Sequence, residues 1–227
     1  PTFENPIGKT NVAIFHNWNN IIPLEKRIEP YLNFKGKVAT ISKVLSQKYN
    51  WYFFIPCVDT EFFYPIEPDE TYNYDLAFVG NAIKESELMQ KFFSFGKSKI
   101  KSAIFGNGFN KPLSHQESLK LYSSSLANFN FSMKECFNLD GLIGRPFQIA
   151  ACRGLVISDK TPSLMEIFGD TMLYVDNSID IIKHIEWLKE NEAKRLLMIE
   201  MAYNKVIENY NPKKVIENLL RWIYGNN

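Results

Sequence analysis

Short apolar runs alternate with stretches of helical periodicity along most of the chain. The first group predicts buried strands over 12–15, 38–41 and 51–55, with a helix over 42–49 before the third strand. Beyond a proline-rich stretch the alternation becomes regular. It predicts strands over 75–80, 100–106, 126–132, 155–158 and 172–175, and helices near 84–95, 115–124, 146–153 and 162–168. Strands that are apolar on both faces and alternate with helices indicate an α/β fold with a parallel sheet covered on both sides.

The remaining patterns predict how the chain divides into parts. Prolines punctuate residues 56–68, which predicts a linker because proline interrupts both helix and sheet. Beyond residue 178 the apolar side chains recur every three or four residues, which predicts nearly continuous helix, and Pro212 suits the start of a last one. We therefore expect a reduced N-terminal α/β domain over 1–60, a Rossmann-like domain over 61–210, and a helix over 211–227 that could cross back to the N-terminal domain.

Composition and charge exclude several classes of function. The 26 basic residues and 25 acidic ones leave a net charge of +1, which is not typical of a nucleic-acid binder, so we expect no nucleic-acid partner. Three cysteines and three histidines are scattered without the spacing of a metal site or a disulfide framework, which indicates a reducing, cytoplasmic setting and no essential metal. The sequence contains no apolar run long enough to cross a bilayer. Because it begins at Pro1, we expect it to be part of a longer polypeptide.

The predicted sheet indicates where a ligand would bind. Ligands of such sheets lie outside the carboxyl ends of the strands, which selects the loops 80–84, 106–114, 133–145 and 159–162. The third loop is the most specific, because Gly141 and Gly144 precede a short helix that begins near Pro146 and ends at Gly154. Glycines expose backbone N–H groups, and the start of a helix favours anions.

Arg145 lies at the start of the same short helix, where a cation opposes the helix dipole. A bound diphosphate would reverse that unfavourable effect, and the guanidinium fork matches the geometry of phosphate. The alternative is an arginine that turns into solvent or pairs with Asp140.

Several motifs, in order, resemble a known family. Asp140 and Gln148 have the spacing of an E-x7-E pair, and R-x-F-x-x-x-A-x-x-G follows from Arg145 to Gly154. IPCVDTEFFYP at 55–65 is similar to an interdomain linker, LAFVG at 76–80 to a first strand with its glycine turn, and SHQESLKLY at 114–122 to a later helix. Together they resemble the GT-B-fold glycosyltransferases of the group 1 and CgeB-like families, most clearly in the donor-binding half.

The resemblance implies roles for individual residues. Gln148 would hold the ribose hydroxyls, Asp140 would contact the donor sugar, and Arg145 would approach the diphosphate. Around them, backbone at Gly80, Asn81, Gly141 and Gly144 would let the donor approach closely, and Lys84 would add a second positive charge for the leaving group. Both glutamates of the pattern are replaced here, one by a shorter acid and one by a neutral amide, which is a weaker acceptor.

The predicted activity is transfer of a sugar from a nucleoside diphosphate sugar, a UDP-sugar by preference, to a glycan or other hydroxyl acceptor without metal. His16, directly after the first strand, is the N-terminal candidate for the base that deprotonates the acceptor, and a structural or surface histidine is the alternative. The rival function is a catalytically silent nucleotide-binding or scaffold domain of a larger polypeptide. The donor half leaves only about 60 residues for an acceptor side that usually forms a domain of about 100 residues or more.

Overall fold

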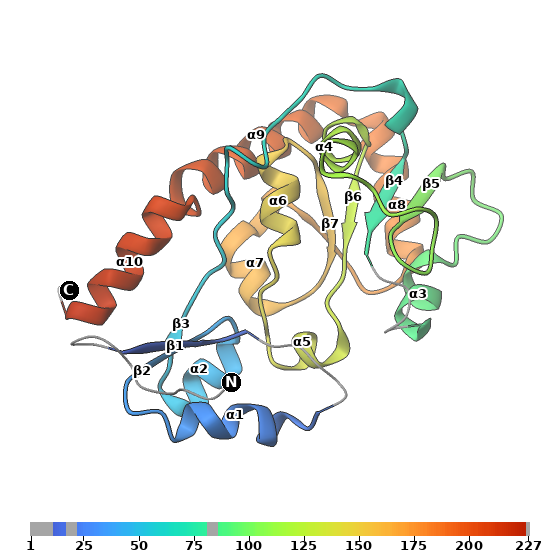
Figure 1. Cartoon of the computed structure of the whole chain (residues 1–227). Helices are drawn as coiled ribbons and strands as arrows, with labels where there is room; N and C mark the ends of the chain where they lie inside the picture. The colour runs from blue at the N-terminus through green and yellow to red at the C-terminus, as the bar shows by residue number, and fades with distance from the viewer. Residues whose placement is uncertain (1–10, 17–21, 81–85, 226–227) are drawn as a thin grey trace.

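Two parallel sheets organise the chain (Figure 1). A computed structural model describes residues 11–16, 22–80 and 86–225. The smaller sheet has the order β1-β2-β3 and the larger sheet the order β5-β4-β6-β7-β8, and each strand pairs in parallel with its neighbours. The prediction of an α/β fold, with a Rossmann-like sheet, a reduced N-terminal α/β unit and a helical C-terminal tail, is confirmed.

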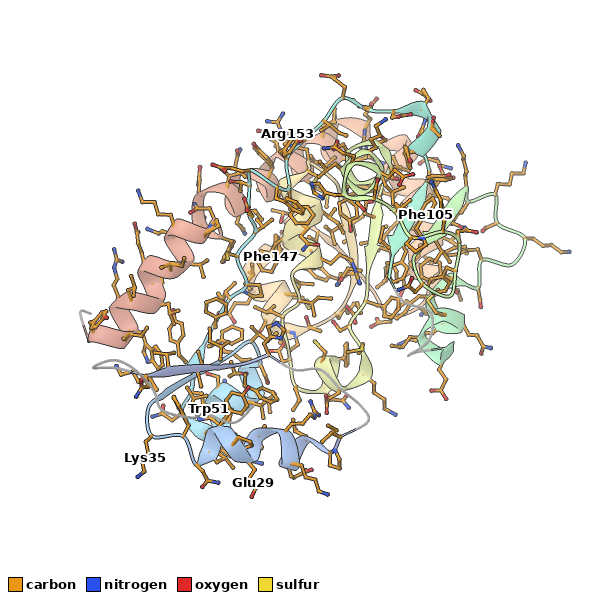
Figure 2. All side chains as sticks on the ribbon, in the orientation of Figure 1. Glu29, Lys35, Trp51, Phe105, Phe147 and Arg153 are labelled. Carbon is orange, nitrogen blue, oxygen red and sulfur yellow. The ribbon has the colours of Figure 1, made fainter. Side chains whose placement is uncertain are left out.

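The smaller sheet belongs to the N-terminal unit. Its elements are β1 (Val12–Phe15), α1 (Leu24–Leu32), β2 (Lys37–Thr40), α2 (Lys43–Tyr49) and β3 (Tyr52–Phe53). Phe15, Ile28 and Leu45 form its buried core, and the Phe15 ring meets Tyr31 edge to face with 5.2 Å between centroids. Trp51 packs against the same core (Figure 2). Apolar residues from three elements therefore close a small core of their own.

The larger sheet is covered by helices on both faces. Phe147, Ala150 and Ala151 of one short helix are fully buried against one face, while Phe78 and Phe129 belong to the aromatic cluster on the other. The strands are β4 (Leu76–Val79), β5 (Ser102–Phe105), β6 (Asn128–Asn130), β7 (Val156–Asp159) and β8 (Leu173–Val175). The helices are α3 (Ser86–Phe93), α4 (His115–Ser124), α5 (Lys134–Asn138), α6 (Arg145–Ala151) and α7 (Pro162–Phe168), with short 3-10 turns at Glu70–Tyr72 and Gly169–Thr171.

The C-terminal helices run along the larger unit and return to the smaller sheet (Figure 1). They are α8 (Ser178–Glu190), α9 (Glu192–Asn209) and α10 (Pro212–Tyr224). Lys37 Nζ donates to the carbonyl oxygens of Trp222 and Ile223, both at 2.7 Å, so it supplies a cation at the carboxyl end of α10. The Tyr52 ring stacks on Trp222 with 4.7 Å between centroids. The last helix is thereby attached to β2 and β3.

The start of α2 joins the two units. Its N-cap residue Ser42 accepts a hydrogen bond from Leu45 N at 3.1 Å and donates its hydroxyl to Leu139 O, in the larger unit, at 2.6 Å. Lys43 N donates to Asp140 O at 3.1 Å. These bonds satisfy backbone groups that the first turn of a helix otherwise leaves without partners. A partly buried ion pair between Arg27 of α1 and Glu135 of α5 reinforces the junction.

Replacement of Ser42 should therefore cost more stability than loss of a helix cap alone. Ser114 caps α4 with a bond from Glu117 N but makes no comparable contact between the units, so Ser114→Ala is the control. We expect Ser114→Ala to lower the free energy of unfolding by about 1 kcal/mol. Ser42→Ala should lower it by about 2–3 kcal/mol, because the Leu139 carbonyl also loses its donor. Urea unfolding measures both, and equal losses would show that the contact with Leu139 adds no stability.

Candidate functional site

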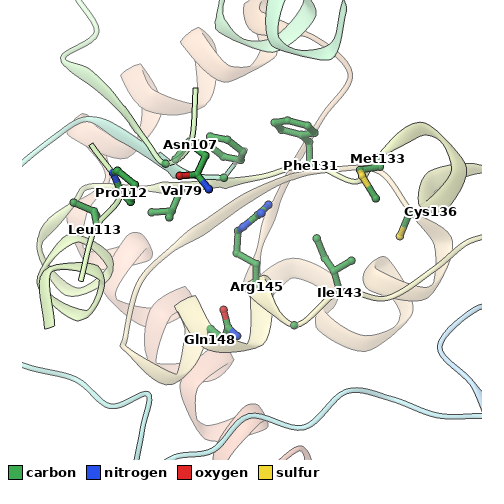
Figure 3. Close-up of a pocket in the computed structure, with 14 residues that line it drawn as sticks. Val79, Asn107, Pro112, Leu113, Phe131, Met133, Cys136, Ile143, Arg145 and Gln148 are labelled. Carbon is green, nitrogen blue, oxygen red and sulfur yellow. The ribbon is translucent and has the colours of Figure 1, made fainter. Parts of the chain in front are cut away.

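A cavity of about 570 Å³ lies at the carboxyl edge of the larger sheet (Figure 3). In the strand order β5-β4-β6 the connections run to opposite sides of β4, which is the position where such sheets bind ligands. Three of the four loops selected from the sequence line the cavity. Its lining consists of Phe78, Val79 and Gly80 at the end of β4; Gly106, Asn107, Pro112 and Leu113 after β5; Phe131, Met133 and Cys136 after β6; and Ile143, Gly144, Arg145 and Gln148 at the start of α6.

The fourth loop faces a different space. Asp159 and Lys160 line a second cavity of about 240 Å³, together with residues of α3 and α5. Of the candidate residues predicted from the sequence, the first cavity brings together Gly80, Gly144, Arg145 and Gln148.

Two glycines allow the ends of β4 and β5 to approach closely. Gly106 has a φ of +125°, and a Cβ at that position would lie 1.8 Å from the carbonyl oxygen of Gly80. Gly80 N donates to Phe105 O at 2.9 Å, which fixes the two strand ends together. Backbone rather than side chain therefore forms this wall of the cavity.

Arg145 extends from the start of α6 into the cavity (Figure 3). Its Nη1 donates to Asn130 Oδ1 at 3.2 Å, and the guanidinium carbon lies 5.0 Å from the centroid of the Phe78 ring. Burial lowers the pKa of Arg145, and Tyr122 and Asp159 oppose that change. An arginine nevertheless keeps its charge in a protein.

The neighbours of Arg145 correct one alternative. Among the described residues, no aspartate or glutamate forms a salt bridge with its guanidinium. The interpretation in which Arg145 pairs with Asp140 or turns into solvent is wrong, because the side chain is held by Asn130 and Phe78. The cavity thus contains a cation whose direct contacts are neutral.

Two other lining residues differ in what they offer a ligand. Gln148 lies one turn further along α6, where its amide is both a donor and an acceptor. Burial raises the pKa of the Cys136 thiol to about 12, so this thiol stays protonated at neutral pH and is not a nucleophile. A Cβ at Gly144 would meet only Gln148 Nε2, at 3.5 Å, so the space beside Gly144 is open.

Asp140 and Gly141 belong to the junction between the units. Asp140 has a φ of 45°, and its two carboxylate oxygens accept hydrogen bonds from Ser163 N at 2.9 Å and Ser163 Oγ at 2.7 Å. It is buried against the first turn of α7 and does not line the cavity. Gly141 pairs with Ser42 in an isolated bridge. Contact between Asp140 and a donor sugar stays a prediction.

The other predicted residues lie apart or outside the description. His16 is exposed directly after β1, at the carboxyl edge of the smaller sheet, and does not line the cavity. Asn81 and Lys84 lie outside the described residues. Within the part of the chain that is described, no three acidic, histidine or cysteine side chains are grouped as metal ligands. None of its helices is long and apolar enough to cross a membrane.

Sequence reasoning missed a chain of buried polar side chains behind Arg145. Asn130 Nδ2 donates to Ser158 Oγ at 2.9 Å, and Ser158 Oγ donates to Asp159 Oδ1 at 3.1 Å. Ser132 N donates to Asp159 Oδ2 at 2.7 Å. Burial raises the pKa of Asp159, and these hydrogen bonds oppose that change. The available signal was the presence of polar residues at the ends of otherwise apolar strands.

Comparison with known families identifies the kind of protein. A family model described as glycosyl transferase-like matches residues 78–221, which is more than half of the chain. The chain belongs to this family. The match includes every described residue of the cavity lining. No curated protein sequence matches the chain significantly.

Solved structures of low sequence identity share the fold. Sucrose-phosphate synthase from Thermosynechococcus elongatus has a TM-score of 0.69 at 12% identity, covering 95% of this chain and 68% of that chain. An alpha-glucosyltransferase in complex with UDP-glucose and DNA containing an abasic site has a TM-score of 0.66 at 13% identity, covering 94% of this chain and 72% of that chain. T4 phage beta-glucosyltransferase in complex with its UDP-glucose substrate has a TM-score of 0.58 at 15% identity, covering 93% of this chain and 73% of that chain. Another structure of that enzyme is in complex with UDP and Mn²⁺.

The contact between the β4 and β5 ends gives a direct test of the cavity wall. Gly106→Ala should lower the free energy of unfolding by several kcal/mol, about 3 or more, because its Cβ and the Gly80 oxygen cannot occupy the same space. Gly96→Ala is the matched control, since Gly96 also has a positive φ but no atom within 4 Å of its Cβ position. It should cost only about 1–2 kcal/mol. Thermal unfolding measures both, and equal costs would contradict the close approach.

Proposed function

We propose that the chain transfers a sugar from a nucleoside diphosphate sugar to a hydroxyl acceptor, with the donor held in the cavity of the larger unit. The observation that carries the proposal is the Arg145 cation in a cavity of about 570 Å³, oriented by Asn130 and Phe78. That volume lies within the usual range of about 300–1,000 Å³ for ligand sites. Membership of the glycosyl transferase-like family supplies the class of reaction. The UDP-glucose complexes of structural neighbours favour a UDP-sugar.

The cavity offers what the leaving group needs. Negative charge develops on the diphosphate as the sugar departs, and a fixed cation in a partly buried site stabilises that charge. The Arg145 fork suits two phosphate oxygens at once. Gln148 would bond the ribose hydroxyls with its amide, and the backbone at Gly80 and Gly144 would lie against the donor. Roles for Asn81, Lys84, Gly141 and Asp140 remain parts of the same proposal.

The acceptor side of the proposal rests on the smaller unit. His16 is exposed directly after β1, and we assign to it the role of the base that deprotonates a glycan or other hydroxyl acceptor. Placement in the group 1 or CgeB-like branch, and origin from a longer polypeptide, belong to the proposal too. The cysteines Cys57, Cys136 and Cys152 are free thiols, which fits the expected cytoplasmic setting.

Nucleotide binding is tested by thermal unfolding with UDP and UDP-sugars. A ligand at 100 times its Kd should add about 2.7 kcal/mol to the free energy of unfolding. Arg145→Ala should abolish most of that gain, because it removes the cation of the cavity. The matched control is Arg153→Ala, an exposed arginine just after α6 that pairs with Glu200, and it should keep the gain.

The outcomes separate the two candidate functions. Transfer or hydrolysis of a bound UDP-sugar supports the enzyme. Binding without any turnover would favour the silent nucleotide-binding domain. Two observations support that alternative: Gln148 is neutral, and the Asp140 carboxylate is already bonded to Ser163. If no nucleotide changes the unfolding temperature, the enzyme and the nucleotide-binding domain are both excluded, and only the scaffold domain is left.

Metal independence is tested separately. Since Arg145 would supply positive charge to the diphosphate, we expect EDTA to change the rate of transfer less than twofold. This corresponds to a change of about 0.4 kcal/mol or less in the activation free energy. Added Mn²⁺ or Mg²⁺ should not restore activity beyond that of the EDTA-treated protein. A tenfold or greater loss in EDTA, reversed by a divalent cation, would contradict this part of the proposal.

A further inference from the structure

The orientation of Arg145 depends on a neutral amide. Its Nη1 bonds Asn130 Oδ1 at 3.2 Å, and Asn130 is 1% exposed at the end of β6. A carboxylate in that position would also orient the guanidinium but would neutralise it. An amide oxygen fixes the direction of the side chain and leaves its charge for a ligand.

The hydrogen bonds behind Asn130 have only one consistent direction. The Asp159 carboxylate accepts at Oδ1, so the Ser158 hydroxyl donates to it at 3.1 Å. Ser158 Oγ then accepts from Asn130 Nδ2 at 2.9 Å. The Asn130 amide is therefore turned so that its oxygen faces Arg145. Each donor meets an acceptor along the whole chain.

The far end of this chain is anchored in the sheet. Asp159 is 4% exposed at the end of β7, and its second oxygen accepts from Ser132 N at 2.7 Å, in the turn that leads to α5. Ser158 is fully buried in β7. This chain of hydrogen bonds thus connects the ends of β6 and β7 with the start of α6. Its three acceptor side chains, those of Asn130, Ser158 and Asp159, are all buried.

We propose that Asn130, Ser158 and Asp159 are positioning residues, which hold the Arg145 guanidinium toward the diphosphate of the donor through a directional chain of hydrogen bonds. This inference rests on the proposed function, because it assumes that Arg145 binds the diphosphate. Flexible arginine side chains lose rotamer entropy when they bind a ligand, and an arginine that is already oriented loses less. Removal of a link should weaken binding of the diphosphate without removing any group that touches it.

The test compares the Kd values of UDP and uridine by calorimetry. Ser158→Ala removes the hydroxyl that orients Asn130 and should raise the Kd of UDP about fivefold to tenfold, the factor for one buried hydrogen bond. The Kd of uridine, which has no diphosphate, should change less than twofold. Equal changes for the two ligands would indicate a general distortion of the cavity and would overturn the proposal.

A double-mutant cycle asks whether Ser158 acts through Arg145. Arg145→Ala alone should raise the Kd of UDP about 10-fold to 100-fold. In that background Ser158→Ala should have almost no further effect, since the side chain that it positions is absent. Multiplicative effects of the two substitutions would contradict the positioning role. An unchanged Kd in Arg145→Ala would instead overturn the proposed function, so the two failures are distinguishable.

Two further variants keep the test decisive if Ser158→Ala does not fold. Asn130→Asp puts a carboxylate beside Arg145 and should raise the Kd of UDP at least tenfold by neutralising the guanidinium; an unchanged Kd would overturn the proposal. Asn128→Ala is the matched control, because Asn128 is 1% exposed in the same strand and bonds Tyr122 O instead of Arg145. It should leave the Kd of UDP unchanged. A rise equal to that in Ser158→Ala would show that loss of any buried polar side chain in this part of the sheet has the same effect, and would overturn the proposal.

Discussion

A positive charge at the carboxyl edge of the larger sheet is held by groups that orient it and do not neutralise it. Arg145 contacts the oxygen of Asn130 and the ring of Phe78, and its nearest carboxylate in the chain of hydrogen bonds, Asp159, is two side chains away. A cation in such a position is unfavourable while the cavity is empty of anions. In the proposed function, a bound diphosphate would supply the negative charge that makes this arrangement favourable.

The segment that follows β6 performs two tasks at once. Met133 and Cys136 line the cavity, while Glu135 of the same turn of helix pairs with Arg27 of the N-terminal unit. A few residues later, the carbonyls of Leu139 and Asp140 accept the bonds that cap α2. The position of the smaller unit is therefore coupled to the wall of the cavity.

The sequence predicted those parts of the fold that depend on local patterns. Each of the eight strands in the described part of the chain overlaps a predicted strand, because most of them lie in short apolar runs. Helix α1 was missed, since Pro30 lies inside it and its buried residues include the charged Arg27. Helix α5 was treated as a loop because five residues carry too little periodicity. Motif spacing located Arg145 and Gln148 at the cavity. The same spacing could not show that Asp140 is bonded to Ser163, or that Asn130 bonds Ser158 on the neighbouring strand.

The central claim is that Arg145 faces the diphosphate of a nucleotide in this cavity. A crystal structure of the protein with UDP tests it most directly. We predict phosphate oxygens within hydrogen-bond distance of the Arg145 guanidinium, about 2.7–3.2 Å, with Asn130 still bonded to the same side chain. UDP bound elsewhere, or bound here with its phosphates turned away from Arg145, would contradict it.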